Sequence, residues 1–242
     1  MAQFPTPVRG DLLNLLNQVR FFPEAEVKSA LVQLNEEVLA RLEADGIGVE
    51  QVIYVSVDKA GSSSPVMLNM LRDAANLERR GARFVDSKDE RGINEITNQL
   101  GTGAIVYVDD FAGTGRQFVR NHSRTSEYVI GTFSEFFLSV VMCEEAVEKV
   151  EAAGVTPVTS LVHYKAERPL HAECSTLETS VKERIVDLCR TIHPHEGLGF
   201  KRMATMVVLY RNAPNTTPLL FRGSLRQVPY CGILPRSDDL FY

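Results

Sequence analysis

Two adjacent aspartates, Asp109 and Asp110, stand between an apolar stretch and a glycine-rich turn. The residues before them, Ala104–Val108 (AIVYV), have the apolar and β-branched composition of a buried strand. Gly113 and Gly115 permit a backbone with positive φ, which can aim successive N–H groups into one concavity at the start of a helix. Such a concavity suits a phosphate monoester, because a helix N-terminus attracts negative charge. The two carboxylates can hold the hydroxyls of a ribose or orient water around Mg²⁺.

Two other interpretations of the paired acids compete with a phosphate site. An apolar strand that ends in two acids is also typical of a Walker B strand, but the sequence contains no GxxxxGK[ST] phosphate loop. A tight turn without any ligand is the second alternative. It is disfavoured because neighbouring carboxylates repel each other, which is costly where only a turn is needed. The residues therefore favour a site for ribose and phosphate.

A second polar loop, Asp58–Ser64 (DKAGSSS), follows another apolar stretch, Val49–Val57, which predicts a buried strand. Pro65 suits the first turn of the helix that comes next, and a serine before it can cap that helix. In the usual topology of such sheets this loop lies beside Asp109 and Asp110. Taken alone, the loop is more often an exposed turn, and only the combination with the two acids favours a binding role.

Strands alternate with helices of about ten residues through the middle of the chain, which predicts an α/β fold. The expected architecture is a mostly parallel twisted sheet of about five to six strands with right-handed crossovers, flanked by helices. A polar segment that contains a glycine, Ser87–Asn94 (SKDERGIN), predicts a mobile loop. Strands are expected at 49–57, 82–85, 104–108, 135–143 and 155–163.

The two ends of the chain depart from this alternation. Residues 11–45 carry apolar side chains at steps of three and four, interrupted by Pro23, which predicts an N-terminal helical hairpin. We expect the hairpin to pack on the main domain, with dimerisation or partner docking as the alternative. Towards the other end, a helix over Val181–Arg190 and a strand over Ala204–Tyr210 precede a Pro- and Asn-rich loop. The predicted domains are 1–48 and 49–242, with 166–242 forming a tail or hood.

Composition narrows the class of protein. The chain has 242 residues, 44% hydrophobic and 24% charged, with a net charge of -5, which is ordinary for a globular protein and gives no reason to expect nucleic acid as a partner. No apolar run approaches the ~20 residues of a membrane helix, and no secretory signal is visible. Four scattered cysteines without a CxxC pair predict reduced thiols in a cytoplasm. The segment His193–Glu196 (HPHE) has no evident fourth ligand and predicts a polar loop.

The stretch from Ile105 to Gln117 resembles the phosphoribosyl-pyrophosphate signature of type I phosphoribosyltransferases, in which apolar residues and two acids precede a Gly- and Thr-rich loop. By that resemblance, Asp109 and Asp110 contact the 2′- and 3′-hydroxyls of the ribose. The segment Ser87–Asn94 takes the place of the family's flexible catalytic loop. The residues implied around the 5′-phosphate are Ala112, Gly113, Thr114, Gly115 and Arg116. Those implied around the pyrophosphate are Lys59, Ala60, Gly61 and Ser62.

The tail carries a second resemblance. Gly197–Phe200 (GLGF) and Asn212–Phe221 (NAPNTTPLLF) look like the carboxyl end of phosphoribosyltransferase-like domains from bacterial conflict and anti-phage loci. Those domains share a long N-terminal helical segment, a DDFxGxG motif and a PNxTxP element. The likeness covers residues 50–236 and implies a hood that recognises a base, with a role in antiviral defence. Gly113 stands where purine-salvage members often carry an acid as general base, so the resemblance assigns no catalytic residue.

Two functions of different classes follow as expectations. The first is a glycosyltransferase of nucleotide metabolism that binds phosphoribosyl pyrophosphate or a nucleotide with Mg²⁺ as cofactor, and transfers the phosphoribosyl group to or from a nitrogenous base. The second is a non-catalytic sensor of a nucleotide or ribose phosphate that regulates a protein partner. In the second case the N-terminal helices are the expected docking element. Neither membrane nor nucleic acid is expected as a partner, and oligomerisation stays open.

Overall fold

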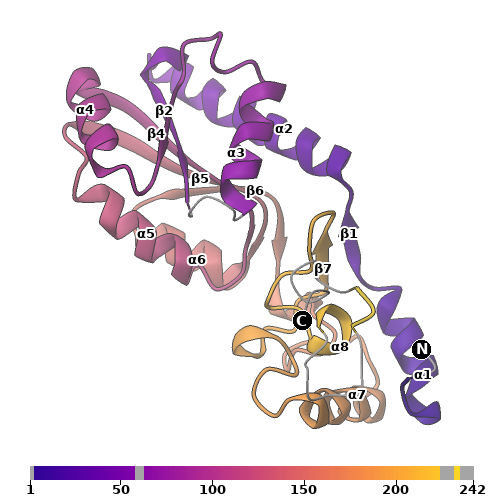
Figure 1. Cartoon of the computed structure of the whole chain (residues 1–242). Coiled ribbons are helices and arrows are strands. Elements are labelled where there is room, and N and C mark those ends of the chain that lie inside the picture. Colours follow the sequence, from indigo (N-terminus) through magenta and orange to yellow (C-terminus); the bar gives the residue numbers. More distant parts are fainter. Residues whose placement is uncertain (1–2, 58–62, 224–231, 235–242) are drawn as a thin grey trace. The chain divides into compact units, whose positions relative to one another are not determined.

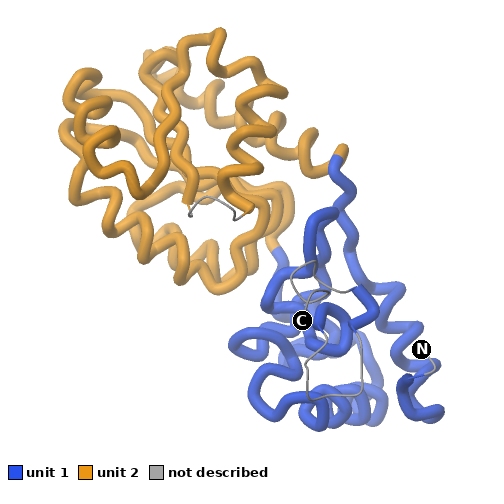
Figure 2. Tube along the Cα trace, in the orientation of Figure 1, with its two compact units in different colours: residues 1–24, 163–242 blue, residues 25–162 orange. Residues whose placement is uncertain are grey.

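The computed structural model describes residues 3–57, 63–223 and 232–234 (Figure 1). The chain forms two compact units (Figure 2). One unit is continuous and comprises residues 25–162, whereas the other combines residues 1–24 with residues 163–242. The boundaries between these units lie elsewhere than the predicted domain boundary at residue 48. Within the described residues, no helix is both long enough and apolar enough to cross a membrane.

The unit of residues 25–162 is built on a five-stranded parallel sheet. The strand order is β3-β2-β4-β5-β6, so β2, the first of these strands along the chain, lies inside the sheet and β3 lies at its edge. Long apolar runs explain the two central strands, because every residue of β2 is buried, as is the apolar part of β4. The strands are β2 (Val52–Ser56), β3 (Arg83–Asp86), β4 (Thr102–Ala112), β5 (Thr132–Cys143) and β6 (Thr156–His163).

Helices cover both faces of this sheet (Figure 1). On one face lie α2 (Glu24–Ala44) and α3 (Ser63–Ala74), and α2 presents the predicted stripe of buried apolar residues. The other face is covered by α4 (Glu90–Leu100), α5 (Arg116–Ser126) and α6 (Glu144–Ala152). Side chains from these three helices form one hydrophobic core with β2, β4 and β5. The predicted α/β class, parallel sheet and flanking helices are therefore confirmed.

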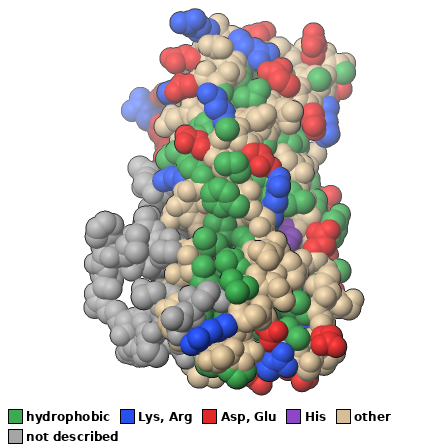
Figure 3. Space-filling model, turned by 90° about the vertical axis from the view of Figure 1, so that its right-hand side faces the viewer, with side chains coloured by type: hydrophobic (Ala, Val, Ile, Leu, Met, Phe, Trp, Pro, Cys, Tyr) green, Lys and Arg blue, Asp and Glu red, His purple; other side chains and the backbone are tan. Residues whose placement is uncertain are grey.

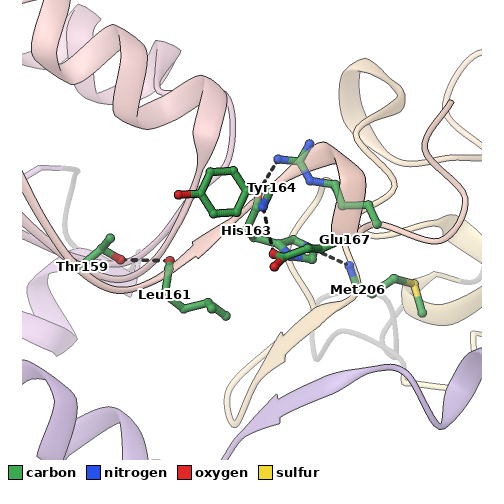
Figure 4. A network of polar contacts seen from close by, with 7 residues as sticks. Thr159, Leu161, His163, Tyr164, Glu167 and Met206 are labelled. Carbon is green, nitrogen blue, oxygen red and sulfur yellow. Dashed lines mark hydrogen bonds and ion pairs between the residues drawn. The ribbon is translucent and has the colours of Figure 1, made fainter. Parts of the chain in front are cut away.

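The second unit joins the two ends of the chain. Its helices are α1 (Thr6–Leu16), α7 (Thr179–Ile192) and α8 (Leu219–Arg222), and a two-stranded parallel sheet pairs β1 (Arg20–Phe22) with β7 (Val207–Leu209). Apolar residues of all three helices share one core. The chain enters this unit through an ordered turn after β6 (Figure 4). There the buried Arg168 donates to the His163 carbonyl at 2.6 Å, and the His163 ring accepts from the Met206 amide at 3.3 Å.

Several local predictions need correction. The expected N-terminal hairpin is replaced by two helices that belong to different units, because β1 between them pairs with β7 near the other end of the chain. The strand expected over Val49–Val57 begins only at Val52, after a 3₁₀ turn. Most of the loop expected at Ser87–Asn94 is helical, since Asp89 accepts the Gly92 amide at 2.9 Å and caps α4. The strand expected over Ala204–Tyr210 shrinks to β7.

The tail motif lies within the core of its unit. Thr216 and Thr217 of the Pro- and Asn-rich segment are buried, and the Thr216 hydroxyl lies 2.8 Å from that of Thr205. Gly199 of the GLGF segment has a φ of +81°, and a Cβ there would collide with the Thr216 carbonyl. The two resembling segments therefore pack against each other.

On the molecular face shown in Figure 3, basic and acidic side chains are interspersed.

Candidate functional site

The carboxyl ends of β2 and β4 meet where the connections of the sheet change direction. From β2 the chain passes through α3 to the edge strand β3, whereas from β4 it passes through α5 to β5 on the other side. In an open parallel sheet of this strand order, the crevice at this switch point is where ligands bind. The two strands pair from Val52↔Ala104 to Ser56↔Val108. The predicted position of the strand before the polar loop, beside the strand of Asp109, is thus confirmed, whereas residues 58–62 lie outside the described residues.

Asp109 is buried at the end of β4, with 8% of its surface exposed. Its Oδ1 atom accepts two hydrogen bonds, from the Ser63 hydroxyl at 2.8 Å and from the Asp110 backbone amide at 2.9 Å. Burial, followed by the charge of Asp110, raises the pKa of the Asp109 carboxyl well above its ordinary value, and the bond from Ser63 opposes this shift. The charged form of Asp109 is therefore disfavoured in the protein alone, and a bound cation would stabilise it.

Asp110 is half-buried, and the strand that was expected to end in the two acids continues two residues beyond them. The strand β4 continues to Ala112, because β5 runs beside it as far as the pairs Phe111↔Val141 and Ala112↔Met142. Two neighbouring carboxyls are thereby carried on ordered backbone. The Asp110 side chain lies close enough to Asp109 for its charge to raise the pKa of that carboxyl.

The loop after β2 is anchored at both of its ends. The buried Ser64 hydroxyl accepts from the Val57 amide and donates to the Val108 carbonyl, both at 2.6 Å. The Asn121 side chain, from α5, donates to the Val57 carbonyl. These bonds fix the end of β2 and the start of α3 against β4 and α5. The predicted pyrophosphate-binding residues Lys59, Ala60, Gly61 and Ser62 lie outside the described residues.

The turn between β4 and α5 depends on Gly115. This residue has a φ of +67° and serves as the N-cap of α5. A Cβ at this position would lie 3.0 Å from the Ala146 Cα and 3.2 Å from the Lys149 Cβ, so α6 leaves room only for glycine. The prediction of positive φ is confirmed for Gly115. It is wrong for Gly113, which does not occur among the glycines with positive φ.

Backbone groups of this turn are oriented from both sides. The Lys149 ammonium, from α6, donates to the Thr114 carbonyl at 2.8 Å. Since the C=O and N–H of a trans peptide point in opposite directions, the Gly115 N–H is turned away from Lys149. The Val119 amide bonds the Gly115 carbonyl at 3.0 Å and closes the first turn of α5. The amides before it have no acceptor inside the helix and suit an anion.

The structure brings together the predicted 5′-phosphate-binding residues in one short segment. Ala112 is buried at the end of β4, Gly113 and Thr114 are half-buried, and Arg116 is exposed as the first residue of α5. This segment adjoins Asp109 and Asp110 directly. Two carboxyl groups therefore lie next to a turn whose backbone N–H groups can donate hydrogen bonds. This arrangement can bind the hydroxyls and the phosphate of one sugar phosphate.

Four residues of the site were not identified from the sequence: Ser63, Ser64, Asn121 and Lys149. The run of serines before Pro65 was a signal for helix capping, but not for bonds to β4. Ser63 and Asp109 are separated by 46 positions in the chain, and Lys149 and Thr114 by 35. Such pairs become visible only once the strand order is known.

A buried polar cluster lies further along β4, towards its amino end. The Tyr107 hydroxyl donates to Glu135 Oε2 at 2.9 Å, and the His122 ring lies 2.9 Å from the same atom. Burial, together with the charge of Glu135, raises the pKa of Tyr107 above its ordinary value. The His122 ring also stacks on Phe118, with centroids 5.5 Å apart. These contacts fasten α5 to β4 and β5.

The HPHE segment shows a local structural role. His193 Nδ1 accepts from the Glu196 amide at 2.9 Å and faces the His195 amide at 3.4 Å, which closes the turn after α7. Throughout the part of the chain that the structure describes, no three His, Cys, Asp or Glu side chains gather in a way that could hold a metal ion. A divalent cation at the candidate site would thus share its ligands between Asp109, Asp110 and a bound molecule.

Comparison with solved structures identifies phosphoribosyltransferases among the similar folds. An orotate phosphoribosyltransferase from Aeropyrum pernix has 16% identity and a TM-score of 0.39, with 57% of this chain and 69% of that chain covered. A hypoxanthine-guanine phosphoribosyltransferase from Schistosoma mansoni has 18% identity and a TM-score of 0.35, covering 50% and 58%. The corresponding values for a xanthine-guanine-hypoxanthine phosphoribosyltransferase from Helicobacter pylori are 12%, 0.38, 61% and 92%.

Because these TM-scores are below 0.5, the fold assignment rests on the strand order and register of this chain itself. No curated protein matches the sequence at a significant level. The family assignment comes from the sequence, which matches the PRTase-CE family over residues 1–236. The chain therefore belongs to the PRTase-CE family, a family of type I phosphoribosyltransferase-like proteins.

Proposed function

We propose that the unit of residues 25–162 binds phosphoribosyl pyrophosphate, or a nucleotide, together with Mg²⁺. The observation that carries this proposal is the adjacency of Asp109 and Asp110 to a turn fixed by Gly115 at the switch point of a parallel sheet. Two carboxylates match two ribose hydroxyls as acceptors, and the start of α5 matches a phosphate as donor. A single sugar phosphate joins both kinds of group.

In this proposal each group of residues binds a different part of the ligand. Backbone amides from Gly113 to Arg116 bind the 5′-phosphate, assisted by the Thr114 hydroxyl. Asp109 and Asp110 bind the ribose hydroxyls, and Lys59 in the loop after β2 contacts the pyrophosphate. Mg²⁺ fits this donor set, because it prefers oxygen ligands and is usually held by one or two carboxylates plus phosphate oxygens. When bound, it would neutralise charge on the leaving pyrophosphate.

Transfer of the phosphoribosyl group would displace pyrophosphate at the anomeric carbon. The bond between that carbon and the pyrophosphate oxygen breaks, a bond to a nitrogen of the acceptor base forms, and the acceptor loses a proton. The protein contributes positioning and charge stabilisation, since the acids hold the sugar and do not attack it. In the reverse direction, pyrophosphate would attack the anomeric carbon of a nucleotide at the same site and the base would leave.

A sensor without turnover is the second candidate, and the residue that favours it is Gly113. This position lies in the turn after the two acids and carries no side chain, so the turn supplies no general base of its own. Such a protein would bind a nucleotide or ribose phosphate and pass its occupancy to a protein partner. Release of pyrophosphate with any nitrogenous base contradicts the sensor, whereas affinity without release supports it.

Calorimetric titration of Mg²⁺ and phosphoribosyl pyrophosphate tests the binding site. Wild type is expected to bind, and the variant Asp109→Asn/Asp110→Asn is expected to lose binding. Asp73→Asn serves as the matched control, because Asp73 is an exposed carboxylate paired with Arg72 on α3. A folded wild type that binds neither phosphoribosyl pyrophosphate nor nucleotides would contradict the proposal.

A role in anti-phage defence is a separate proposal that rests on the DDFxGxG and PNxTxP resemblance. It is tested by plating phage on bacteria that carry the gene together with its chromosomal neighbours. We expect the wild-type locus to lower plating efficiency and the Asp109→Asn/Asp110→Asn locus to lose this effect. Equal plating with and without the wild-type locus, across a broad phage panel, would oppose a defensive role.

A further inference from the structure

Ser63 links the loop after β2 to the acidic pair on β4. It is the first residue of α3 and follows directly on the predicted pyrophosphate-binding residue Ser62. Its hydroxyl donates to Asp109 Oδ1 at 2.8 Å, so one hydrogen bond between side chains connects the start of α3 to β4. Ser63 is half-buried, whereas Asp109 is buried. This bond lies within the candidate site and not behind it.

The neighbouring serine has a different task. Ser64 is fully buried, and its hydroxyl satisfies two backbone groups, the Val57 amide and the Val108 carbonyl. Those bonds hold α3 against the carboxyl ends of β2 and β4, whether or not a ligand is bound. The Ser63 hydroxyl, by contrast, donates to an ionisable side chain, the Asp109 carboxyl, which we assign to ligand binding. Ser64 thus has a structural role, whereas Ser63 has a functional one.

The geometry at Asp109 explains why its orientation matters. The hydrogen bonds from the Ser63 hydroxyl and from the Asp110 amide both end on Oδ1, and the Asp110 side chain also contacts this carboxyl group. Neither bond uses Oδ2. A carboxylate can accept about four hydrogen bonds, and the two donors on Oδ1 restrict the orientation of the group. Hydrogen bonds to a charged acceptor are also stronger than neutral ones.

We propose that Ser63 is a positioning residue that orients Asp109 towards the ribose hydroxyls of the bound ligand. This inference rests on the proposed function, and it adds a residue outside both segments that the resemblance assigns. Loss of the hydroxyl weakens recognition of the sugar and not of the phosphates.

The experiment compares two ligands on the full chain by calorimetry with Mg²⁺ present. Phosphoribosyl pyrophosphate carries ribose hydroxyls, whereas inorganic pyrophosphate has none. For Ser63→Ala we expect about a tenfold loss of affinity for phosphoribosyl pyrophosphate, the scale of one hydrogen bond to a charged group. Affinity for inorganic pyrophosphate should stay as in wild type. Ser63→Thr retains the hydroxyl and should restore most of the lost affinity.

Two further variants show whether an effect is local damage. Ser126→Ala removes an exposed hydroxyl that bonds a helix carbonyl on α5 and should leave both affinities unchanged. Ser64→Ala should lower the unfolding temperature more than Ser63→Ala, because Ser64 satisfies two buried backbone groups and Ser63 bonds one side chain. An equal loss for both ligands in Ser63→Ala, or no loss for either, overturns the role of Ser63. A wild type that binds inorganic pyrophosphate but not phosphoribosyl pyrophosphate overturns the proposed function itself.

Discussion

Replacing Asp109 with asparagine should make the folded protein more stable while abolishing ligand binding. The amide oxygen of asparagine can accept the same two hydrogen bonds, from the Ser63 hydroxyl and the Asp110 amide. The negative charge, however, is removed from a side chain that is only 8% exposed and stands next to another carboxyl. The substitution is nearly isosteric, so it creates no cavity. Stability and binding are thus expected to change in opposite directions.

The magnitude follows from the cost of burying the charged group. A buried polar group with incomplete compensation costs about 1–3 kcal/mol, and charged groups lie at the upper end of this range. We therefore expect the free energy of unfolding to rise by about 1–3 kcal/mol. For a chain of this size, each kcal/mol raises the unfolding temperature by about 2–4 °C.

The sign of the pH dependence is fixed by the raised pKa of Asp109. Between its ordinary value and its raised value, the carboxyl is protonated in the folded state and ionised in the unfolded state. The folded state then binds more protons, so this group's contribution to stability falls as the pH rises through that window. The advantage of Asp109→Asn should consequently be smallest in acid and largest above the raised pKa.

Urea denaturation in the presence of EDTA, at a series of values from about pH 5 to about pH 8, measures this advantage. Asp110→Asn is the comparison variant, because it removes only the neighbouring charge and should stabilise less. A variant Asp109→Asn that is less stable than wild type near pH 8 would refute the reasoning. So would an advantage that does not change with pH.

Three other substitutions test separate parts of the site. Gly115→Ala places a Cβ 3.0 Å from the Ala146 Cα at a φ of +67°, and it should cost about 1–2 kcal/mol in urea denaturation and weaken phosphate binding; unchanged stability would contradict the steric argument. Ser64→Ala removes the shared partner of two backbone groups and should cost about 1–3 kcal/mol in thermal unfolding, with Ser126→Ala as the neutral control. Glu135→Gln weakens the contact with His122 but keeps an acceptor for Tyr107, so it should lower the free energy of unfolding by about 1 kcal/mol. A gain in stability would show that this cluster does not stabilise the packing of α5 on the sheet.

The central strands and the acidic pair could be predicted from sequence because their signals are local. The segment AIVYV is apolar and β-branched, and the two acids follow it immediately. The stripe of α2 also repeats at helical spacing and is buried as expected. The strand β1 could not be predicted, because three residues carry too short a pattern and their partner β7 lies almost the whole chain away.

The remaining differences arise from contacts between distant residues. The loop expected at Ser87–Asn94 was inferred from its polarity, yet Asp89 supplies an N-cap and the polar residues form the exposed face of α4. The bond from Ser63 to Asp109 depends on the pairing of β2 with β4, and the bond from Lys149 to the Thr114 carbonyl depends on the packing of α6. Neither pairing is encoded in a short motif. The assignment of α1 to the unit of the tail has the same cause.

A crystal structure of the protein with phosphoribosyl pyrophosphate and Mg²⁺ tests the central claim most directly. We predict the 5′-phosphate within hydrogen-bonding distance of the backbone amides from Gly113 to Arg116, and the ribose hydroxyls on the carboxylates of Asp109 and Asp110. Density for the ligand at any other place, or none at the carboxyl ends of β2 and β4 under saturating ligand, would contradict it.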